Sequence, residues 1–270
     1  MVRNGINMLR TSAGVRASVN PNLGSAIYFD GTSKNIEAST DLSGFKITTS
    51  LTIGCWVYCL SNTGQFQLLI NKTNYSNNRR QYWLVLNQTT GLPSFQTSSN
   101  GSGSVGINGK TPIAITSGLN KWRFVVGKYN STTPSMSIYV DGLQEGYTTA
   151  SVSSSLYNGV EPIKIGSDAN SANQHPNAYI KGAFVVNGLV SDGDINKLKM
   201  VGPNKEKMKT ILSSYTLVGL YDLSNGGTDS SGNSNTLDSI TGTFTYQSVL
   251  GSDSGIGLPA ITSSGSRTNV

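Results

Sequence analysis

The chain contains few residues whose type and spacing could support catalysis. Its one histidine, His175, lies in the loop sequence NQHPN, and no Gly-x-Ser-x-Gly elbow accompanies it. We therefore interpret His175 as a solvated loop residue rather than as a member of a Ser-His-Asp triad. The nearest carboxylates, Asp141 and Glu145, flank the turn Asp141-Gly142, where Asp is favoured for its backbone hydrogen bonds. The sequence thus predicts no catalytic residues and a protein that is not an enzyme.

Two sets of residues bear on disulfide formation and metal binding, and the number and spacing of the Cys and His residues exclude a Cys/His metal site. Cys55 and Cys59 are four positions apart in one predicted strand, so their Cα atoms are ~13 Å apart, beyond the ~7 Å limit for a disulfide. We expect both thiols in the core. Asp229, Asn233 and Asn235 offer oxygen ligands of the kind that calcium prefers, but the same residues are typical of a tight turn. We favour the turn, so the prediction is no metal and no cofactor, with calcium left open.

Aromatic side chains in or beside polar loops are candidates for sugar binding. Loops at the end of a rigid sandwich commonly carry binding sites. The alternative, which we favour, is that these rings cover the hydrophobic core. For this reason no binding residue is predicted outright. The candidates are Tyr75, Arg79, Tyr82, Tyr157 and Tyr179.

The elements that must position these residues are mostly strands. Charged residues make up 13% of the chain, about half of the usual ~25%, and Gly, Ser, Thr and Asn take their place. Residues 121–146 alternate between apolar and polar and contain Asp141-Gly142, typical of a type I′ hairpin turn. Residues 51–60 are apolar on both faces, which indicates a central strand. The sequence therefore predicts an all-β, antiparallel fold.

Further strands, one long loop and two short helices complete the expected elements. Residues 97–110 are rich in Gly and Ser, and we expect a mobile loop there. Ser191 has the pattern of an N-cap, and Gly202-Pro203 would end one helix and place Pro203 at the first position of the next, within 191–213. The further strands are expected at 26–29, 36–38, 45–49, 66–71, 81–87, 94–97, 163–166, 178–186, 215–223, 236–240 and 243–250.

The composition also sets expectations for domains and partners. We expect an N-terminal arm at 1–24, one domain at 25–250 and a C-terminal tail at 251–270. The arm holds three arginines and no acid, which suits a partner surface, although a first strand plus a loop is an equal alternative. The net charge of +6 is too dilute for a nucleic-acid footprint, and no signal peptide or membrane span is visible.

Several segments, in order, resemble the laminin-G-like jelly roll of the concanavalin A-like lectin/glucanase group. The resemblance spans residues 25–245, and in many members the last of these motifs precedes the first, as though the ends were permuted. It implies a two-sheet antiparallel jelly-roll sandwich, with calcium in some members. The Glu-x-Asp-x-Glu strand motif of the glucanases is absent. The segments are AIYFDGTSKNIEAS, SLTIGCWVYC, KWRFVVGKYNSTTPSMSIYVDGLQEG, IKIGSDAN, AYIKGAFVVNGLVSDGDINKL and GLYDLSNGGTDSSGNSNTL.

These observations favour a non-catalytic module displayed on a particle. Relatives with this fold usually act outside cells, yet no export signal is visible, and virions leave by lysis. We therefore expect a virion surface protein, a capsid decoration or fibre protein of a tailed phage, that stabilises the particle or adheres to glycans. Its partners would be other virion proteins or copies of itself, bound through the arms, and glycans, with no nucleic acid and no membrane. The alternatives are a soluble lectin of a cell and, last, a glycoside hydrolase.

Overall fold

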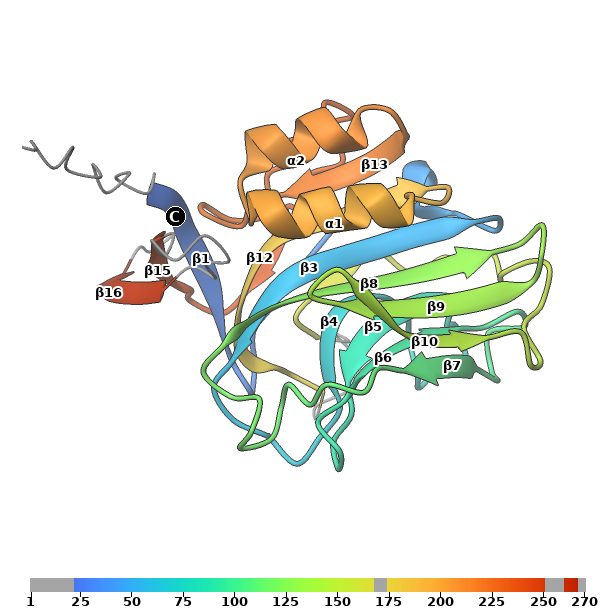
Figure 1. The fold of residues 1–270 in the computed structure, drawn as a ribbon, viewed down its shortest axis with the longest axis horizontal. Coiled ribbons are helices and arrows are strands. Elements are labelled where there is room, and N and C mark those ends of the chain that lie inside the picture. The colour runs from blue at the N-terminus through green and yellow to red at the C-terminus, as the bar shows by residue number, and fades with distance from the viewer. Residues whose placement is uncertain (1–21, 168–173, 251–259, 267–270) are drawn as a thin grey trace, which may run out of the picture.

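Alternating apolar side chains build two antiparallel sheets that pack face to face in the computed structural model (Figure 1). The structure describes residues 22–167, 174–250 and 260–266. We call the two layers the helix-side sheet and the far sheet. The helix-side sheet has nine strands: in order β10 (Leu143–Thr148), β9 (Ser135–Val140), β8 (Trp122–Asn130), β3 (Leu51–Cys59), β12 (Asn177–Asn187), β1 (Asn22–Asp30), β15 (Thr245–Leu250) and β16 (Ala260–Ser266), with β13 (Thr216–Tyr221) paired to β12.

The far sheet has seven strands and closes against the first along one side. Its order is β14 (Ser239–Thr241), β2 (Asn35–Glu37), β11 (Lys164–Ile165), β4 (Gln67–Lys72), β5 (Tyr82–Leu86), β6 (Pro93–Thr97) and β7 (Val105–Asn108). The edge strands β10 and β7 lie side by side, so this edge of the sandwich is covered (Figure 1). The predicted all-β sandwich is confirmed.

The main core lies between the sheets. From β3 it takes the face that carries Cys55 and Cys59, and both thiols are buried and free, as predicted. Phe95 of β6 reaches across from the far sheet. A Cβ added at Gly127 of β8 would lie 2.3 Å from the Phe95 ring, so only glycine lets the two layers approach this closely here.

A second core lies on the outer face of the helix-side sheet. Helix α1 (Asp192–Val201) and helix α2 (Lys205–Leu212) lie together there (Figure 1). Trp56 of β3 and Phe124 of β8 stack with ring centroids 5.1 Å apart, and the helices cover them with Leu198 and Met208. This explains why β3 is apolar on both faces. Ser191 caps α1, as predicted, by accepting a hydrogen bond from the Asp194 amide.

Three local predictions were wrong. Residues 45–49 form no strand: the chain makes a 3-10 helix at Ser43–Phe45, and side chains bind its carbonyls instead of a strand partner. Residues 97–110 contain β7, because Val105 and Ile107 alternate and pack against the main core. Pro203 precedes α2 rather than starting it, since Asn204 is the N-cap and accepts from the Lys207 amide.

The predicted arms fall largely outside the described residues. Strand β1 begins at Asn22, and β16 lies within the predicted tail and pairs with β15. Residues 1–21, 251–259 and 267–270 are not described, so the arms and the domain boundaries at 25 and 250 stay predictions. None of the helices in the described ranges has the length and apolar character needed to span a bilayer.

Candidate functional site

Three loops meet at one end of the sandwich, and they hold three of the five sugar-binding candidates. We call residues 72–81, 98–103 and 157–161 the loop end. The Arg80 amide donates to the Gly101 carbonyl (3.1 Å), and the Tyr157 amide donates to the Ser98 carbonyl (2.8 Å). The loops that carry Tyr75, Arg79 and Tyr157 therefore lie side by side, which is the arrangement that a loop-borne site would need.

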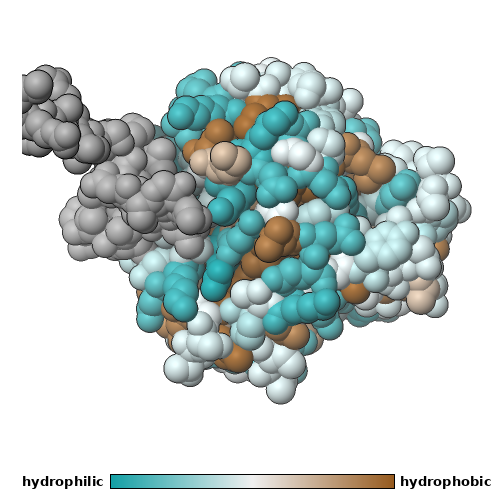
Figure 2. Space-filling model, viewed as in Figure 1, coloured by the Kyte–Doolittle hydropathy of each residue, from teal (hydrophilic) through white to brown (hydrophobic). Residues whose placement is uncertain are grey.

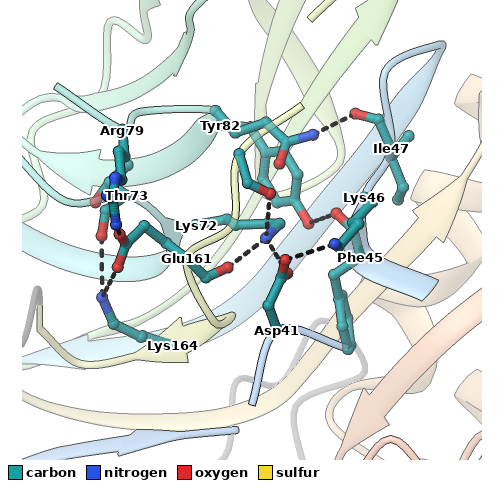
Figure 3. A network of polar contacts seen from close by, with 12 residues as sticks. Asp41, Phe45, Lys46, Ile47, Lys72, Thr73, Arg79, Tyr82, Glu161 and Lys164 are labelled. Atoms are coloured by element: carbon teal, nitrogen blue, oxygen red, sulfur yellow. Dashed lines mark hydrogen bonds and ion pairs between the residues drawn. The ribbon is translucent and has the colours of Figure 1, made fainter. Parts of the chain in front are cut away.

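A buried ionic network underlies the loop end (Figure 3). The Lys72 side chain is 0% exposed, and its ammonium donates to Asp41 Oδ1 (2.6 Å), to the Gly159 carbonyl (3.1 Å) and to the Glu161 carbonyl. Lys46 pairs with the other oxygen of Asp41 at 2.8 Å. An ammonium has three N–H donors, so Lys72 is fully satisfied.

The network holds loops together rather than presenting charge to a ligand. Burial lowers the pKa of Lys72, and the contact with Asp41 acts against that shift. On the side of Glu161, the carboxylate pairs with Arg79 at 3.3 Å and with Lys164 at 3.9 Å (Figure 3). Because the acids and bases of this network face one another, it acts as an anchor for the loops.

Two of the aromatic candidates, Tyr75 of the loop end and Tyr82 at the start of β5, pack against other parts of the protein, which is the interpretation that the sequence favoured. Tyr82 is buried, and its hydroxyl donates to the Phe45 carbonyl at 3.0 Å. Tyr75 packs edge-to-face with Trp83, with ring centroids 5.8 Å apart, and the Arg80 guanidinium lies over the Tyr75 ring, 4.3 Å from its centroid. Neither ring is free to stack on a sugar without giving up these contacts.

The fifth candidate, Tyr179, lies on the helix-side sheet, away from the loop end. It belongs to a row of rings on neighbouring strands, all on the outer face. Tyr28 is 5.1 Å from Tyr179, and Tyr58 is 6.2 Å from Tyr179 and 5.6 Å from Trp122. The row follows the strand register, in which Tyr28 is opposite Tyr179 and Tyr58 is opposite both Tyr179 and Trp122.

His175 is not a solvated residue, and that prediction was wrong. Its ring is buried, with 9% of the residue exposed, and the two ring nitrogens lie 3.4 Å from Ser167 Oγ and from the Lys34 carbonyl. The loop that carries it folds back against the turn after β1, where the Gly31 amide donates to the Pro176 carbonyl. This packing buries the imidazole.

The carboxylate pair of the sequence has separate structural roles. Asp141 has φ 51° and Gly142 φ 86°, which confirms the type I′ turn. Asp141 pairs with Arg123 at 2.6 Å and accepts from the Phe124 amide at 3.0 Å. Glu145 accepts from the backbone amides and the hydroxyl of residues 110–111, which ties β10 to the loop after β7.

The residues considered for calcium, Asp229, Asn233 and Asn235, form hydrogen bonds within the protein instead. Asp229 Oδ1 accepts from the Leu220 and Ser231 amides, and Oδ2 accepts from Ser231 Oγ and from the Asn235 amide at 2.9 Å. The amide nitrogens of Asn233 and Asn235 donate to the Val218 carbonyl. Donors already occupy both carboxylate oxygens, so this set does not fit a calcium ion. Within the described ranges, no group of three or more His, Cys, Asp or Glu side chains is placed to bind a metal.

An open groove of about 380 Å³ lies on the outer face of the helix-side sheet, beside the start of α1. Its floor is formed by outward-facing residues of β8, β9 and β10, and one wall by the segment that leads into α1. Tyr147 is 56% exposed and Leu189 39%. The lining residues are Lys128, Asn130, Thr133, Ser135, Ser137, Tyr139, Gln144, Tyr147, Leu189 and Asp192.

The polar side chains of the groove are held in place by one another. Lys128 Nζ donates to Asp192 Oδ1 (2.6 Å), and the Tyr139 hydroxyl lies 2.8 Å from the same oxygen and 2.9 Å from Gln144 Oε1. Burial favours the neutral form of Lys128 and would lower its pKa, but the hydrogen bonds to Asp192 and Tyr139 outweigh burial and raise its pKa. Burial likewise opposes the charge of Asp192, and the bonds from Lys128 and Tyr139 prevail and lower its pKa. Both groups are therefore charged at neutral pH.

A smaller hollow of about 230 Å³ lies beside the loop end, between residues 97–105 and 151–156. Its polar groups largely bond within their own loop: Ser98 Oγ accepts from the Gly101 amide, and Asn100 Oδ1 accepts from the Ser102 and Gly103 amides. No aromatic ring is among the described residues that line it. The groove is thus the better candidate, since it places the exposed Tyr147 ring beside polar side chains that the protein holds in position.

Sequence reasoning missed the groove. Its floor was visible as alternation, because Ser135, Ser137 and Tyr139 alternate along the strand with Met136 and Ile138, which are buried in the main core. What the sequence did not show is that Asp192, 53 residues after Tyr139, comes to the same place. The face that carries α1 is mainly hydrophilic and has only small, separate hydrophobic patches (Figure 2).

Comparison with known proteins places the chain in a family. Residues 30–196 match the model of the concanavalin A-like lectin/glucanases superfamily, and the chain belongs to it. A search of curated proteins finds no match. The predicted family is confirmed; a phage origin stays a prediction.

Two solved structures show the same fold at low identity. A putative carbohydrate-binding protein from Bacteroides ovatus is 14% identical, with TM-score 0.59, over 88% of this chain and 62% of its own length. The heptameric SAP-like pentraxin from Limulus polyphemus is 12% identical, with TM-score 0.51, over 65% of this chain and 82% of its own. At such identities the likeness establishes the fold alone.

Proposed function

We propose that the chain is a non-catalytic module that binds glycans in the groove beside α1. The observation that carries this proposal is the exposed ring of Tyr147 at the edge of a floor of hydroxyl and amide groups. A sugar ring has one apolar C–H face and a rim of hydroxyls. An exposed aromatic ring can contact the apolar face, while Asn, Gln, Ser and Thr exchange hydrogen bonds with the rim.

The openness of the groove suits a chain or branch of sugars rather than a small molecule. Drug-sized ligands are usually enclosed in apolar pockets that bury most of their surface. Here the floor is the outer face of three strands, and only the segment that leads into α1 forms a wall. A rigid sheet face with preset polar groups binds an extended glycan without ordering a loop.

The fold supports the proposal by analogy. The Bacteroides ovatus protein with the same fold is described as a putative carbohydrate-binding protein. Folds host many functions, so the argument for this chain rests on its own groove and not on that description.

The charges of the groove argue for binding without hydrolysis. Glycosidases of the usual kind place two carboxylates about 5–9.5 Å apart, one as acid and one as nucleophile or base. Among the described residues that line the groove, Asp192 is the one carboxylate, and it is paired with Lys128. The groove therefore lacks the second carboxylate that this chemistry requires.

A glycan array probed with the labelled full chain tests the proposal, followed by calorimetry on the best ligand. Tyr147→Ala is expected to weaken that ligand at least about tenfold, or ~1.4 kcal/mol. The matched control is Leu143→Ala, which removes a more exposed side chain (68%) from the same strand but outside the groove. Absence of binding to any glycan, or equal binding by parent and Tyr147→Ala, would overturn the proposal.

Display on a virion surface is the narrower form of this proposal. It rests on the sequence argument that the fold usually acts outside cells, and the groove is compatible with adhesion from a particle. Peptide mass spectrometry of purified particles from the source tests it. Absence of the chain from the particles would leave the alternative, a lectin module of a cell.

A further inference from the structure

Lys128 is the one cation among the described residues that line the groove, and the protein itself already surrounds it. The Lys128 side chain is only 15% exposed, and its ammonium contacts Asp192 Oδ1 at 2.6 Å and the Val190 carbonyl at 3.3 Å. It also lies 4.9 Å from the centroid of the Tyr139 ring, whose face attracts a cation. Two hydrogen bonds and the face of one ring thus surround an ammonium that is already mostly enclosed, so little of it is open to a ligand.

The one anion of the groove is in the opposite situation. Asp192 Oδ1 receives both Lys128 and the Tyr139 hydroxyl, but no hydrogen bond from the described part of the chain reaches Oδ2. The Asp192 side chain is 64% exposed. A carboxylate oxygen accepts hydrogen bonds and donates none. Oδ2 therefore offers a bound molecule a charged acceptor.

The other lining residues are uncharged, so they do not change this imbalance. They comprise two amides, three short hydroxyl side chains, two tyrosines and one leucine. A ligand thus meets a free carboxylate oxygen without a free cation. Sugar hydroxyls donate to such an oxygen, whereas the carboxylate or sulfate of an acidic sugar has no proton to donate and repels it.

We infer that the groove selects neutral glycans over sialylated, uronate-containing or sulfated ones, an inference that rests on the proposed function. Lys128 and Tyr139 position Asp192 through Oδ1, and Oδ2 of this exposed side chain is left to accept from a ligand. Selectivity comes from the penalty for a second negative charge as well as from the hydrogen bonds to hydroxyls.

The test compares matched pairs of glycans. The array carries neutral core oligosaccharides together with their sialylated, uronate-containing and sulfated derivatives. Calorimetry then measures the affinity of the chain for the best neutral core and for its derivatives in 50 mM and 500 mM NaCl. We expect the neutral core to bind at least about tenfold more tightly at low salt. The ratio should shrink at high salt, because salt screens exposed charges.

A charge-removing variant assigns the effect to one residue. Asp192→Asn keeps the size of the side chain and is expected to reduce the ratio of affinities to about threefold or less, mainly by improving the binding of acidic derivatives. Asp238→Asn is the matched control: it makes the same change in net charge on an acid that bonds Ser39, outside the groove, and should leave the ratio unchanged.

The outcomes separate this inference from the proposed function. If acidic derivatives bind the parent as tightly as the neutral core or more tightly, the inference is wrong while glycan binding in the groove stands. An unchanged ratio in Asp192→Asn also overturns it. If no glycan binds at all, the proposed function itself fails.

Discussion

The loop end and the groove are both rich in polar side chains, but they use them in opposite ways. At the loop end, Lys72 is buried and gives its three donors to Asp41 and two backbone carbonyls. In the groove, Lys128 is equally occupied, yet its partner Asp192 keeps one oxygen free and exposed. At the loop end the protein itself satisfies the charged groups, whereas the groove leaves one carboxylate oxygen that a ligand can bind.

The difference shows that a high density of candidate sugar-binding residues does not by itself identify a binding site. Tyr75, Arg79 and Tyr82 have the residue types of a sugar site, but each contacts another part of the protein. The exposed ring is Tyr147, on an ordinary edge strand. Asking which polar atoms lack a partner separates the two regions, because buried polar groups are normally paired.

The largest expected effect concerns the stability of the loop end. Lys72→Met should lower the free energy of unfolding by about 3 kcal/mol, since it removes the buried donor to Asp41 Oδ1 and to two carbonyls and leaves Asp41 with Lys46 alone. Urea unfolding followed by fluorescence measures it. Lys46→Met, which removes the half-exposed partner of the same acid, should cost about 0–1 kcal/mol. Equal losses in the two variants would contradict the idea of an anchor.

A pair of tyrosine variants sharpens the contrast between the regions. Tyr75→Ala should cost about 1–2 kcal/mol of stability, because it loses the Trp83 and Arg80 contacts, and should leave glycan affinity unchanged. Tyr147→Ala should change stability by about 0.5 kcal/mol or less, as is usual for exposed side chains, and weaken binding. Thermal unfolding and calorimetry on the same samples decide it. A loss of glycan binding in Tyr75→Ala would indicate that the binding site lies at the loop end instead.

The contribution of Asp192 to the free energy of unfolding is expected to be small and to decrease as the pH falls. The pKa of Asp192 in the folded chain lies below its ordinary value, because the bonds from Lys128 and Tyr139 outweigh burial. Such a group stabilises the fold above its unfolded pKa, near 4, and the contribution is lost as pH falls through the lowered folded pKa.

Comparison of Asp192→Asn with the parent measures this contribution. The side chain is mostly exposed, so the difference in unfolding free energy should be about 0.5 kcal/mol or less at pH 7 and should vanish towards pH 2. Urea titrations at several pH values test the direction. A difference that grows on acidification would show that the sign is wrong.

The smallest expected effect is that of calcium. The turn that holds Asp229 resembles the loop end, since both of its carboxylate oxygens already accept from the protein. A ligand that binds only the folded state raises its melting temperature. Millimolar calcium or EDTA should therefore shift the melting temperature by less than about 1 °C. A clear rise with calcium, lost in Asp229→Asn, would revive this metal site.

The sequence by itself determined the local elements of this protein. Two-residue alternation predicted β8 and β9, Asp141-Gly142 their turn to β10, and Ser191 the start of α1, because each depends on neighbours along the chain. The prediction of a strand at 45–49 was wrong, because side chains distant in sequence bind the backbone carbonyls of this segment.

Only the tertiary structure decided which polar groups are bonded within the protein and which remain available to a ligand. Lys72 meets Glu161 across 89 residues, and Lys128 meets Asp192 across 64. Residue type does not distinguish the two lysines, since both lie near the end of a strand and both contact three partners. Whether the partner acid is then enclosed or left facing water depends on how the loops and α1 pack on the sheets, and this packing depends on contacts between segments far apart in the chain.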